Sequence, residues 1–188
     1  MPPRIVALGD SLTSGHGIGP AASFPAVLQQ RIDLEGFDYT VINAGVSRDT
    51  STQALQRLDV ALAGDVRILI LAVGANDGFR GVPVAQVRQN LTRIIETAQA
   101  RRIAIVLCGM EALPIHGWNY TQAFHALYEE LASQYRIPLV PFVMMNVLGN
   151  RQLVLPDQIH PNANGARAIA ETIWPYLQPL LKRVRITR

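Results

Sequence analysis

Five short runs of apolar residues are spaced along the chain, and a polar or glycine-rich stretch follows each of them. Several runs are almost continuous in Ile, Val and Leu, which is typical of strands buried on both faces of a sheet. The runs cover residues 5–8, 39–44, 68–73, 103–108 and 139–142. We therefore expect five strands in the core.

The segments between these runs show the three- and four-residue apolar spacing of amphipathic helices. The clearest pattern covers residues 84–98 and follows Pro83, a residue type that is favoured at helix starts. Another begins after Thr50-Ser51-Thr52 and runs as one helix to Leu62. Further helices are expected over residues 24–34, 123–131 and about 165–180, with a disturbance of the last at Trp174-Pro175.

Strands that alternate with helices predict a parallel sheet whose right-handed crossovers place helices on both faces. The expected fold class is α/β, a doubly wound arrangement with a five-stranded parallel sheet. No proline- or glycine-rich linker and no internal repeat divides the chain, so we expect residues 1–188 to form a single domain. Ligands of such sheets bind beyond the carboxyl ends of the strands, which directs attention to the loops after the five runs.

Composition narrows the class of protein. Apolar residues make up 49% of the 188 residues and charged ones 16%, as in an ordinary folded core. The net charge of +3 comes from arginines that are mostly scattered singly, whereas nucleic-acid proteins concentrate them on one stripe. The single cysteine, Cys108, allows no intramolecular disulfide and lies at the end of an apolar run. It is expected to be a core residue, with a catalytic thiol as the alternative.

No apolar segment approaches the roughly 20 residues that span a bilayer, so no stable membrane insertion is expected. The chain as written has no secretion signal and predicts a cytoplasmic protein, or a periplasmic or secreted one if it is a processed form. We expect a monomer or a weak homo-oligomer that acts on a small molecule and binds no nucleic acid.

The first loop, residues 9–15, opens with Gly9-Asp10-Ser11 directly behind a strand and allows three interpretations. It can be a phosphate cradle, an exposed nucleophile, or a tight turn capped by Asp10. The loop lacks the lysine of phosphate-binding loops. A phosphate site would also leave a second polar pair, Asp157 and His160 in the fifth loop (residues 143–162), without a role.

A serine hydroxyl becomes a nucleophile when a base takes its proton and a third group orients that base. His160 can be the base and Asp157 the orienting carboxylate. Asn76, together with backbone N–H groups near Ser11 and in the second loop (residues 45–49), can stabilise an oxyanion. Each piece also has a plain structural interpretation, as a polar turn, a helix cap or a pair of metal ligands. Their order after successive strands favours catalysis.

Four segments together resemble the SGNH (GDSL-type) serine hydrolases. They are Gly-Asp-Ser-Leu at 9–12, Asn-Ala-Gly-Val-Ser-Arg-Asp-Thr-Ser at 43–51, Gly-Ala-Asn-Asp at 74–77 and Asp-Gln-Ile-His-Pro-Asn at 157–162. The sequence is most similar to the small bacterial arylesterase, lysophospholipase and acyl-thioesterase group. The resemblance implies a flavodoxin-like fold without a metal or other cofactor. It implies Ser11 as nucleophile, His160 as base and Asp157 as orienter, with Asn76 and the Ser11 N–H as oxyanion donors.

The second segment departs from the family pattern at Arg48. The group usually has glycine directly before Asp-Thr-Ser, and the N–H of that glycine is the remaining oxyanion donor. The backbone N–H of Arg48 can still donate, although a positive φ would add strain of about 1 kcal/mol or more to a non-glycine residue. Its guanidinium would stand at the cleft mouth, where it can hold an anionic group or restrict entry. We expect intact geometry with altered rate or selectivity.

Apolar residues in the fourth and fifth loops predict a trough that suits an acyl or aryl group better than a sugar. The candidate substrate-binding residues are Gly45, Leu113, Ile115, Trp118, Leu155 and Ile159. The expected function is serine-dependent hydrolysis of carboxylic esters or thioesters with short-to-medium acyl or aryl groups, through an acyl-enzyme. A carbohydrate O-acetylesterase and a catalytically impaired binding protein, for which Arg48 is the hint, are the alternatives.

The four histidines, at positions 16, 116, 125 and 160, show no metal-ligand spacing, and we expect no metal. His125 falls in a helical pattern and is expected at the surface or at its boundary with the core. His16 and His116 lie in loops that border the predicted cleft, so they are candidates for contact with the substrate.

Overall fold

The five apolar runs form one parallel sheet in the computed structural model, which describes residues 2–186. The strands are β1 (Arg4–Gly9), β2 (Thr40–Gly45), β3 (Val66–Ala72), β4 (Ala104–Cys108) and β5 (Leu139–Val140). Their order across the sheet is β2-β1-β3-β4-β5, which is the flavodoxin-like doubly wound order. Strand β2 lies on one side of β1, and β3, β4 and β5 follow on the other side, so the strand order changes direction between β1 and β3. Such sheets bind their ligands at this switch point.

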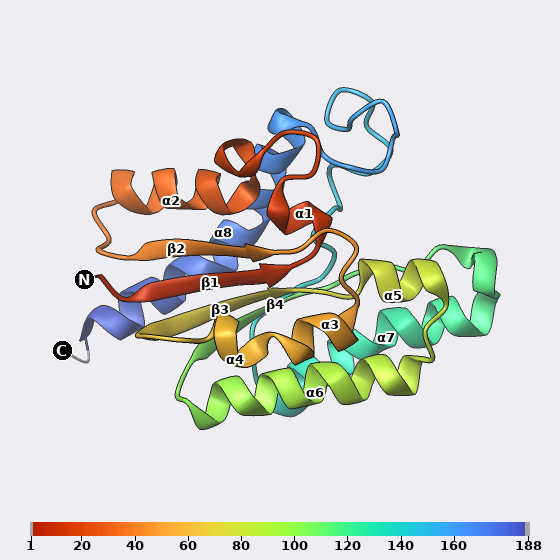
Figure 1. Cartoon of the computed structure of the whole chain (residues 1–188), viewed down its shortest axis with the longest axis horizontal. Coiled ribbons are helices and arrows are strands. Elements are labelled where there is room, and N and C mark those ends of the chain that lie inside the picture. Colours follow the sequence, from red (N-terminus) through yellow and green to blue (C-terminus); the bar gives the residue numbers. More distant parts are fainter. Residues whose placement is uncertain (1, 187–188) are drawn as a thin grey trace.

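Helices cover both faces of the sheet (Figure 1), so the predicted α/β class is confirmed. One face carries α2 (Phe24–Leu34) and α8 (Ala163–Ile186), and the other carries α3 (Ser51–Gln56), α4 (Leu58–Ala61), α6 (Val84–Ala100) and α7 (Trp118–Tyr135). Two short helices, α1 (Ser11–Ser14) and α5 (Ala75–Arg80), and the 3₁₀ turns η1 (Pro20–Ala22) and η2 (Pro114–His116) complete the structure. None of the helices within residues 2–186 has the length and apolar character needed to cross a membrane.

The prediction of one continuous helix from the Thr50-Ser51-Thr52 start signal to Leu62 was wrong, because the structure divides it at Arg57. Helix α3 ends at Gln56, and α4 begins at Leu58. Arg57 leaves helical geometry, with φ −102° and ψ 9°, and its side chain turns toward the end of the sheet, where it finds three oxygen acceptors. Those tertiary contacts stabilise the break, and the apolar spacing alone does not reveal them.

Two further boundaries and one expected helix irregularity differ from prediction. Helix α7 begins at Trp118, inside the expected fourth loop, residues 109–119. Strand β5 ends at Val140, because Pro141 has no N–H with which to extend the ladder. Helix α8 continues through Pro175, where a disturbance was expected. Pro175 and Pro179 both lie inside this helix, and each lacks the backbone N–H for a helical hydrogen bond. The helix nevertheless retains a fully buried apolar stripe of Ile169, Ile173, Leu177 and Leu181.

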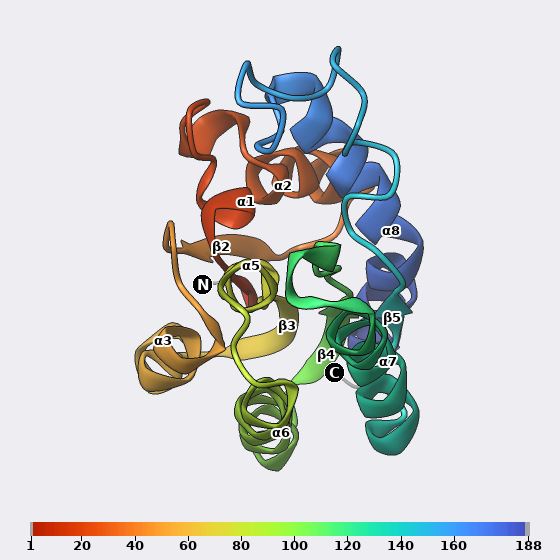
Figure 2. The same cartoon turned by 90° about the vertical axis from the view of Figure 1, so that its right-hand side faces the viewer.

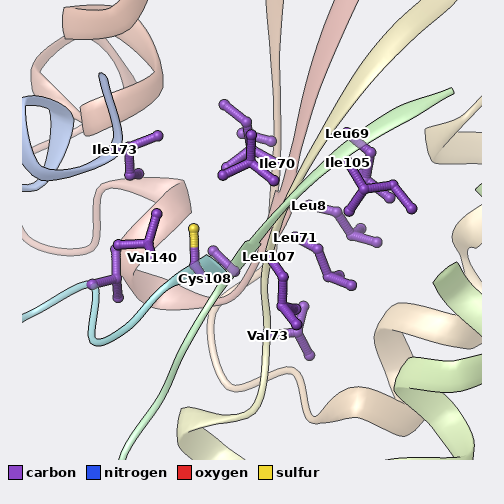
Figure 3. Close-up of a cluster of buried hydrophobic side chains, with 14 of the residues drawn as sticks. Leu8, Leu69, Ile70, Leu71, Val73, Ile105, Leu107, Cys108, Val140 and Ile173 are labelled. Carbon is purple, nitrogen blue, oxygen red and sulfur yellow. The ribbon is translucent and has the colours of Figure 1, made fainter. Parts of the chain in front are cut away.

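The core lies on both faces of the central strands. Leu69, Ile70 and Leu71 are successive residues of β3 and are all fully buried, which explains the continuous apolar runs (Figure 3). Cys108 is buried beside Val140 and Ile173 in the same view. Burial raises the pKa of its thiol to about 12, so the sulfur stays protonated. Cys108 is therefore a packing residue, and the alternative of a catalytic thiol is excluded.

Candidate active site

The loops that follow the strands gather at one end of the sheet, onto which Figure 2 looks. Helix α1 directly follows β1, and α5 begins shortly after β3 ends. These two strands are neighbours at the switch point, and therefore Ser11 and Asn76 come to the same place. The fifth loop lies on the side of α1 opposite to α5, and it brings Asp157 and His160 to the same end of the sheet.

The first loop presents Ser11 on a single turn of helix. The Asp10 carboxylate accepts a hydrogen bond from the N–H of Leu12 at 3.0 Å and so caps the turn. Gly15 ends it in the left-handed conformation, with φ 82°. Gly9 is required by close packing, since a Cβ there would overlap Thr13 Oγ1 and lie 2.8 Å from the carbonyl oxygen of Ala72. Short contacts thus hold the half-buried Ser11 at the strand end.

Ser11, His160 and Asp157 form a continuous hydrogen-bonded chain. His160 Nε2 lies 3.1 Å from Ser11 Oγ, and His160 Nδ1 lies 2.6 Å from Asp157 Oδ2. A proton on Nδ1 satisfies both contacts, because Nδ1 then donates to the carboxylate while Nε2 accepts from the serine hydroxyl. This is the relation between nucleophile, base and orienting group that serine catalysis requires.

Asp157 also holds the backbone of its own turn. Its Oδ1 accepts hydrogen bonds from the N–H groups of Ile159 and His160, both at 3.0 Å. The Ile159 N–H, followed by the His160 imidazole, lowers the pKa of this carboxyl to about 2. Asp157 therefore stays ionised through the ordinary pH range and can stabilise a positive charge on His160.

The candidate oxyanion donors face the same region. Asn76 Nδ2 donates one hydrogen to the Asp49 carbonyl oxygen at 3.0 Å, which positions the amide. Its second hydrogen makes the longer contact to Asp10 Oδ2 at 3.3 Å, which the amide would exchange for an oxyanion. Within residues 2–186, the backbone N–H groups of Ser11 and Arg48 have no hydrogen-bond acceptor and are available to a ligand. Arg48 has φ 73°, the left-handed value at which a non-glycine residue is strained.

Asp10 is fully buried behind the nucleophile. Burial raises the pKa of its carboxyl to about 6, although the Leu12 N–H and the nearby His160 act in the opposite direction. Its second oxygen lies beside Asn76, so the cap of the serine turn also contacts the amide. Sequence reasoning gave Asp10 a role as a cap but did not foresee a buried acid with a raised pKa.

The sequence profile of the GDSL-like Lipase/Acylhydrolase family matches residues 7–168, which include every side chain of this site. The chain belongs to the GDSL-like lipase/acylhydrolase family. It is 36% identical to Esterase TesA of Pseudomonas aeruginosa over 178 residues, which are 94% of this chain and 89% of that one. It is 34% identical to Thioesterase 1/protease 1/lysophospholipase L1 of Escherichia coli K12, over 94% of this chain and 84% of the relative.

Solved structures agree with the sequence matches. A crystal structure of TesA superposes with a TM-score of 0.89 at 35% identity, covering 94% of this chain and 99% of the other. The resemblance to SGNH hydrolases and the expected enzyme class, a carboxylic ester hydrolase, are thereby confirmed.

The predicted substrate-binding residues of this family member have three kinds of surroundings. Leu113, Ile115, Trp118 and Ile159 are large apolar side chains between 50% and 69% exposed. Leu155 lines a cavity of about 300 Å³ together with Arg151, Val154, Pro156 and Gln158. A Cβ at Gly45, in contrast, would overlap the backbone nitrogen of Ser14, so this glycine allows β2 to pack against α1. The structure thus gives Gly45 a packing role, and its contact with a substrate stays a prediction.

The remaining histidines have separate surroundings in the hydrolase. The exposed His16 ring lies 4.5 Å from the His160 ring, measured between centroids, with the two ring planes tilted by 43°. His116 Nε2 lies 2.9 Å from the Phe79 carbonyl oxygen and links η2 to α5. His125 is exposed, as predicted, and contacts Glu111. Within residues 2–186, no three His, Cys, Asp or Glu side chains are grouped to hold a metal ion.

Sequence reasoning missed Arg57, which contacts both the first and the second loop of this hydrolase. A signal was present. An arginine lies between Ala54 and Leu58 in an apolar helical pattern, close after a loop that contains a candidate oxyanion donor. Without the sheet register, nothing showed that its guanidinium would reach the ends of β1 and β2.

Proposed function

We propose that this hydrolase cleaves carboxylic esters and thioesters by two-step acyl transfer, with Ser11 as the nucleophile. The observation that carries this proposal is the chain from Ser11 Oγ to His160 at 3.1 Å and from His160 to Asp157 at 2.6 Å. A chain of this kind serves a reaction in which one hydroxyl must lose a proton and later regain one.

In the first step, Ser11 Oγ attacks the carbonyl carbon of the substrate while His160 Nε2 takes the hydroxyl proton. The carbonyl oxygen becomes an oxyanion, and the N–H groups of Ser11 and Arg48 and the Asn76 amide are its proposed donors. Collapse of the tetrahedral intermediate breaks the bond to the alcohol or thiol, which leaves with the proton from His160. The product of this step is the Ser11 acyl ester.

In the second step, water replaces the alcohol or thiol. His160 takes a proton from the water as it attacks the acyl-enzyme, and then returns a proton to Ser11 as the carboxylic acid leaves. His160 is positively charged at both tetrahedral stages. The ionised Asp157, 2.6 Å away, stabilises that charge and holds the ring in the productive orientation.

The substrate is proposed to carry a short-to-medium acyl or aryl group. The exposed side chains of Leu113, Ile115 and Ile159 offer apolar contact, and each buried methylene adds about 0.8 kcal/mol of binding. The names of the relatives, an esterase and a thioesterase/lysophospholipase, support acyl substrates of this kind. Octanoate esters should therefore be turned over with a higher kcat/KM than acetate esters.

A chain-length series of p-nitrophenyl esters, from acetate to decanoate, tests this proposal in wild type and in Ser11→Ala. Ser133→Ala is the matched control, because Ser133 is an exposed serine on α7. We expect a preference for medium chains in wild type and in the control, and loss of turnover in Ser11→Ala. Substantial turnover by a folded Ser11→Ala would refute the nucleophile, and a preference for acetate would refute the substrate class.

A further inference from the structure

Arg57 reaches three segments at the carboxyl end of the sheet with one side chain. Its Nε lies 2.6 Å from Asp49 Oδ2, its Nη1 donates to the Ala44 carbonyl oxygen at 2.8 Å, and its Nη2 donates to the Gly9 carbonyl oxygen at 2.9 Å. Gly9 ends β1, two residues before Ser11, and Ala44 is near the end of β2. A guanidinium can make these three contacts together because its donors form a rigid planar fork.

The ion pair between Arg57 and Asp49 is strengthened by its partial burial. The side chains of Arg57 and Asp49 are only 24% and 10% exposed, so water competes little with their charge-assisted hydrogen bond. The break between α3 and α4 occurs at Arg57 itself, where the side chain turns toward the sheet. A surface ion pair would give no reason for the helix to divide there.

Asp49 connects Arg57 to the proposed oxyanion donors. Its carboxylate binds Arg57, while its backbone carbonyl oxygen accepts a hydrogen bond from Asn76 Nδ2 at 3.0 Å. The preceding residue is Arg48, which offers a backbone N–H from a strained left-handed conformation with φ 73°. Such a conformation persists only where the surrounding structure holds it. Arg80 adds a second restraint, since its Nη2 donates to the Arg48 carbonyl oxygen at 3.0 Å.

We propose that Arg57 is a positioning residue for the oxyanion site. It ties the second loop to the strand that carries Ser11, so that the Arg48 N–H and the Asn76 amide face the oxygen of a carbonyl attacked by Ser11. Arg57 touches no substrate and acts through Asp49 and the two strand ends. The inference rests on the proposed function, because the donors matter only if Ser11 forms a tetrahedral intermediate.

The expected effect falls on the chemical step. Displacement of donors by a fraction of an ångström weakens transition-state stabilisation and leaves substrate binding almost unchanged. We expect Arg57→Ala to lower kcat about 10- to 100-fold, with KM within about twofold of wild type. Arg57→Lys should recover only a small part of this loss, since one ammonium does not reproduce the planar three-acceptor fork.

Three comparisons separate positioning from a general loss of stability. Arg101→Ala is the matched control, because it removes an arginine from an exposed ion pair with Asp59 on α4 and should retain wild-type kcat. Methylguanidinium should restore part of kcat to Arg57→Ala but not to Arg101→Ala or wild type, and methylammonium should restore none. Asp49→Ala should lower kcat similarly, and the double variant with Arg57→Ala should lose little more than the worse single variant.

The inference is overturned if folded Arg57→Ala, checked by its thermal transition, retains wild-type kcat. It is equally overturned if KM rises while kcat does not change, or if Arg57→Ala and Asp49→Ala act additively. If Arg57→Ala does not fold, the same criteria apply to Arg57→Lys and Asp49→Ala. Failure of the proposed function gives a different result, namely that wild-type Ser11 is not acylated and that Ser11→Ala is active.

Discussion

The first and second loops of the site reach their geometry in different ways. The first loop, residues 9–15, is shaped mainly by contacts among its own residues, through the Asp10 cap, the left-handed Gly15 and the packing of Gly9 against Thr13, and Arg57 adds one hydrogen bond at the Gly9 carbonyl oxygen. In the second loop, residues 45–49, the strained Arg48 and the adjacent Asp49 are held by guanidinium groups from Arg57 and Arg80. A locally built turn tolerates little change, whereas a loop held from outside can accept an unusual residue such as Arg48.

The largest effect is expected at the nucleophile itself. Ser11→Ala and His160→Ala should each lower kcat by about 10⁴-fold or more, since either change breaks the proton transfer that both steps require. The double variant should be no worse than the single ones, because the two residues act as a unit. Steady-state ester hydrolysis measures this, and additive losses in the double variant would contradict it.

A pH-dependent effect on stability is expected from Asp10. Its folded pKa of about 6 lies above the unfolded value of 3.8, so burial of this group costs nothing below about pH 4. The cost grows as the pH rises toward 6 and is complete above that, at about 3 kcal/mol for a shift of about two pH units. Asp10→Asn does not titrate and should gain about this much unfolding free energy relative to wild type between pH 4 and pH 8.

Urea denaturation of both proteins across that pH range measures the difference directly. Effects of other titrating groups cancel in the comparison, as does any constant cost of the new amide beside Asn76. A pH-independent difference between the two proteins would show that Asp10 is ionised as easily in the folded chain as in the unfolded one.

A smaller loss is expected from one added methyl group in the first loop. Gly9→Ala places a Cβ against Thr13 Oγ1 and the Ala72 carbonyl oxygen, and should lower the free energy of unfolding by about 1–3 kcal/mol. Gly36→Ala is a useful control, because a Cβ there meets no atom within 4 Å, although its φ of 72° adds some strain. Because Gly9 has no positive φ, a loss at Gly9 no larger than the loss at Gly36 would contradict the close packing assigned to Gly9.

The smallest effect is expected from the reverse change in the second loop. Arg48→Gly relieves the strain of a positive φ but adds backbone freedom to the unfolded chain, and these contributions nearly cancel. The free energy of unfolding should change by less than about 1 kcal/mol. Turnover of neutral esters should persist, while the ratio between anionic and neutral substrates should change. An unchanged ratio would remove any role of the guanidinium in selectivity.

Much of the fold was predictable because its strands are buried on both faces and read as continuous apolar runs. The meeting of Ser11, Asn76 and His160 at one end followed from parallel topology, which brings the loops after successive strands together. Other features depend on contacts between distant residues. Pro141 shortened β5, and the acceptors at Gly9, Ala44 and Asp49 divided a predicted helix at Arg57. A pattern of apolar spacing contains no information on such partners.

The most direct test of the account is to trap the acyl-enzyme and locate the acyl group. Wild-type protein is mixed with excess p-nitrophenyl octanoate, quenched in acid within the first turnover, and mapped by peptide mass spectrometry. We predict one octanoyl group on Ser11, which disappears at later times as the ester is consumed. No adduct in wild type during active turnover, or an adduct at another residue that forms equally in Ser11→Ala, would contradict the central claim that Ser11 is the nucleophile.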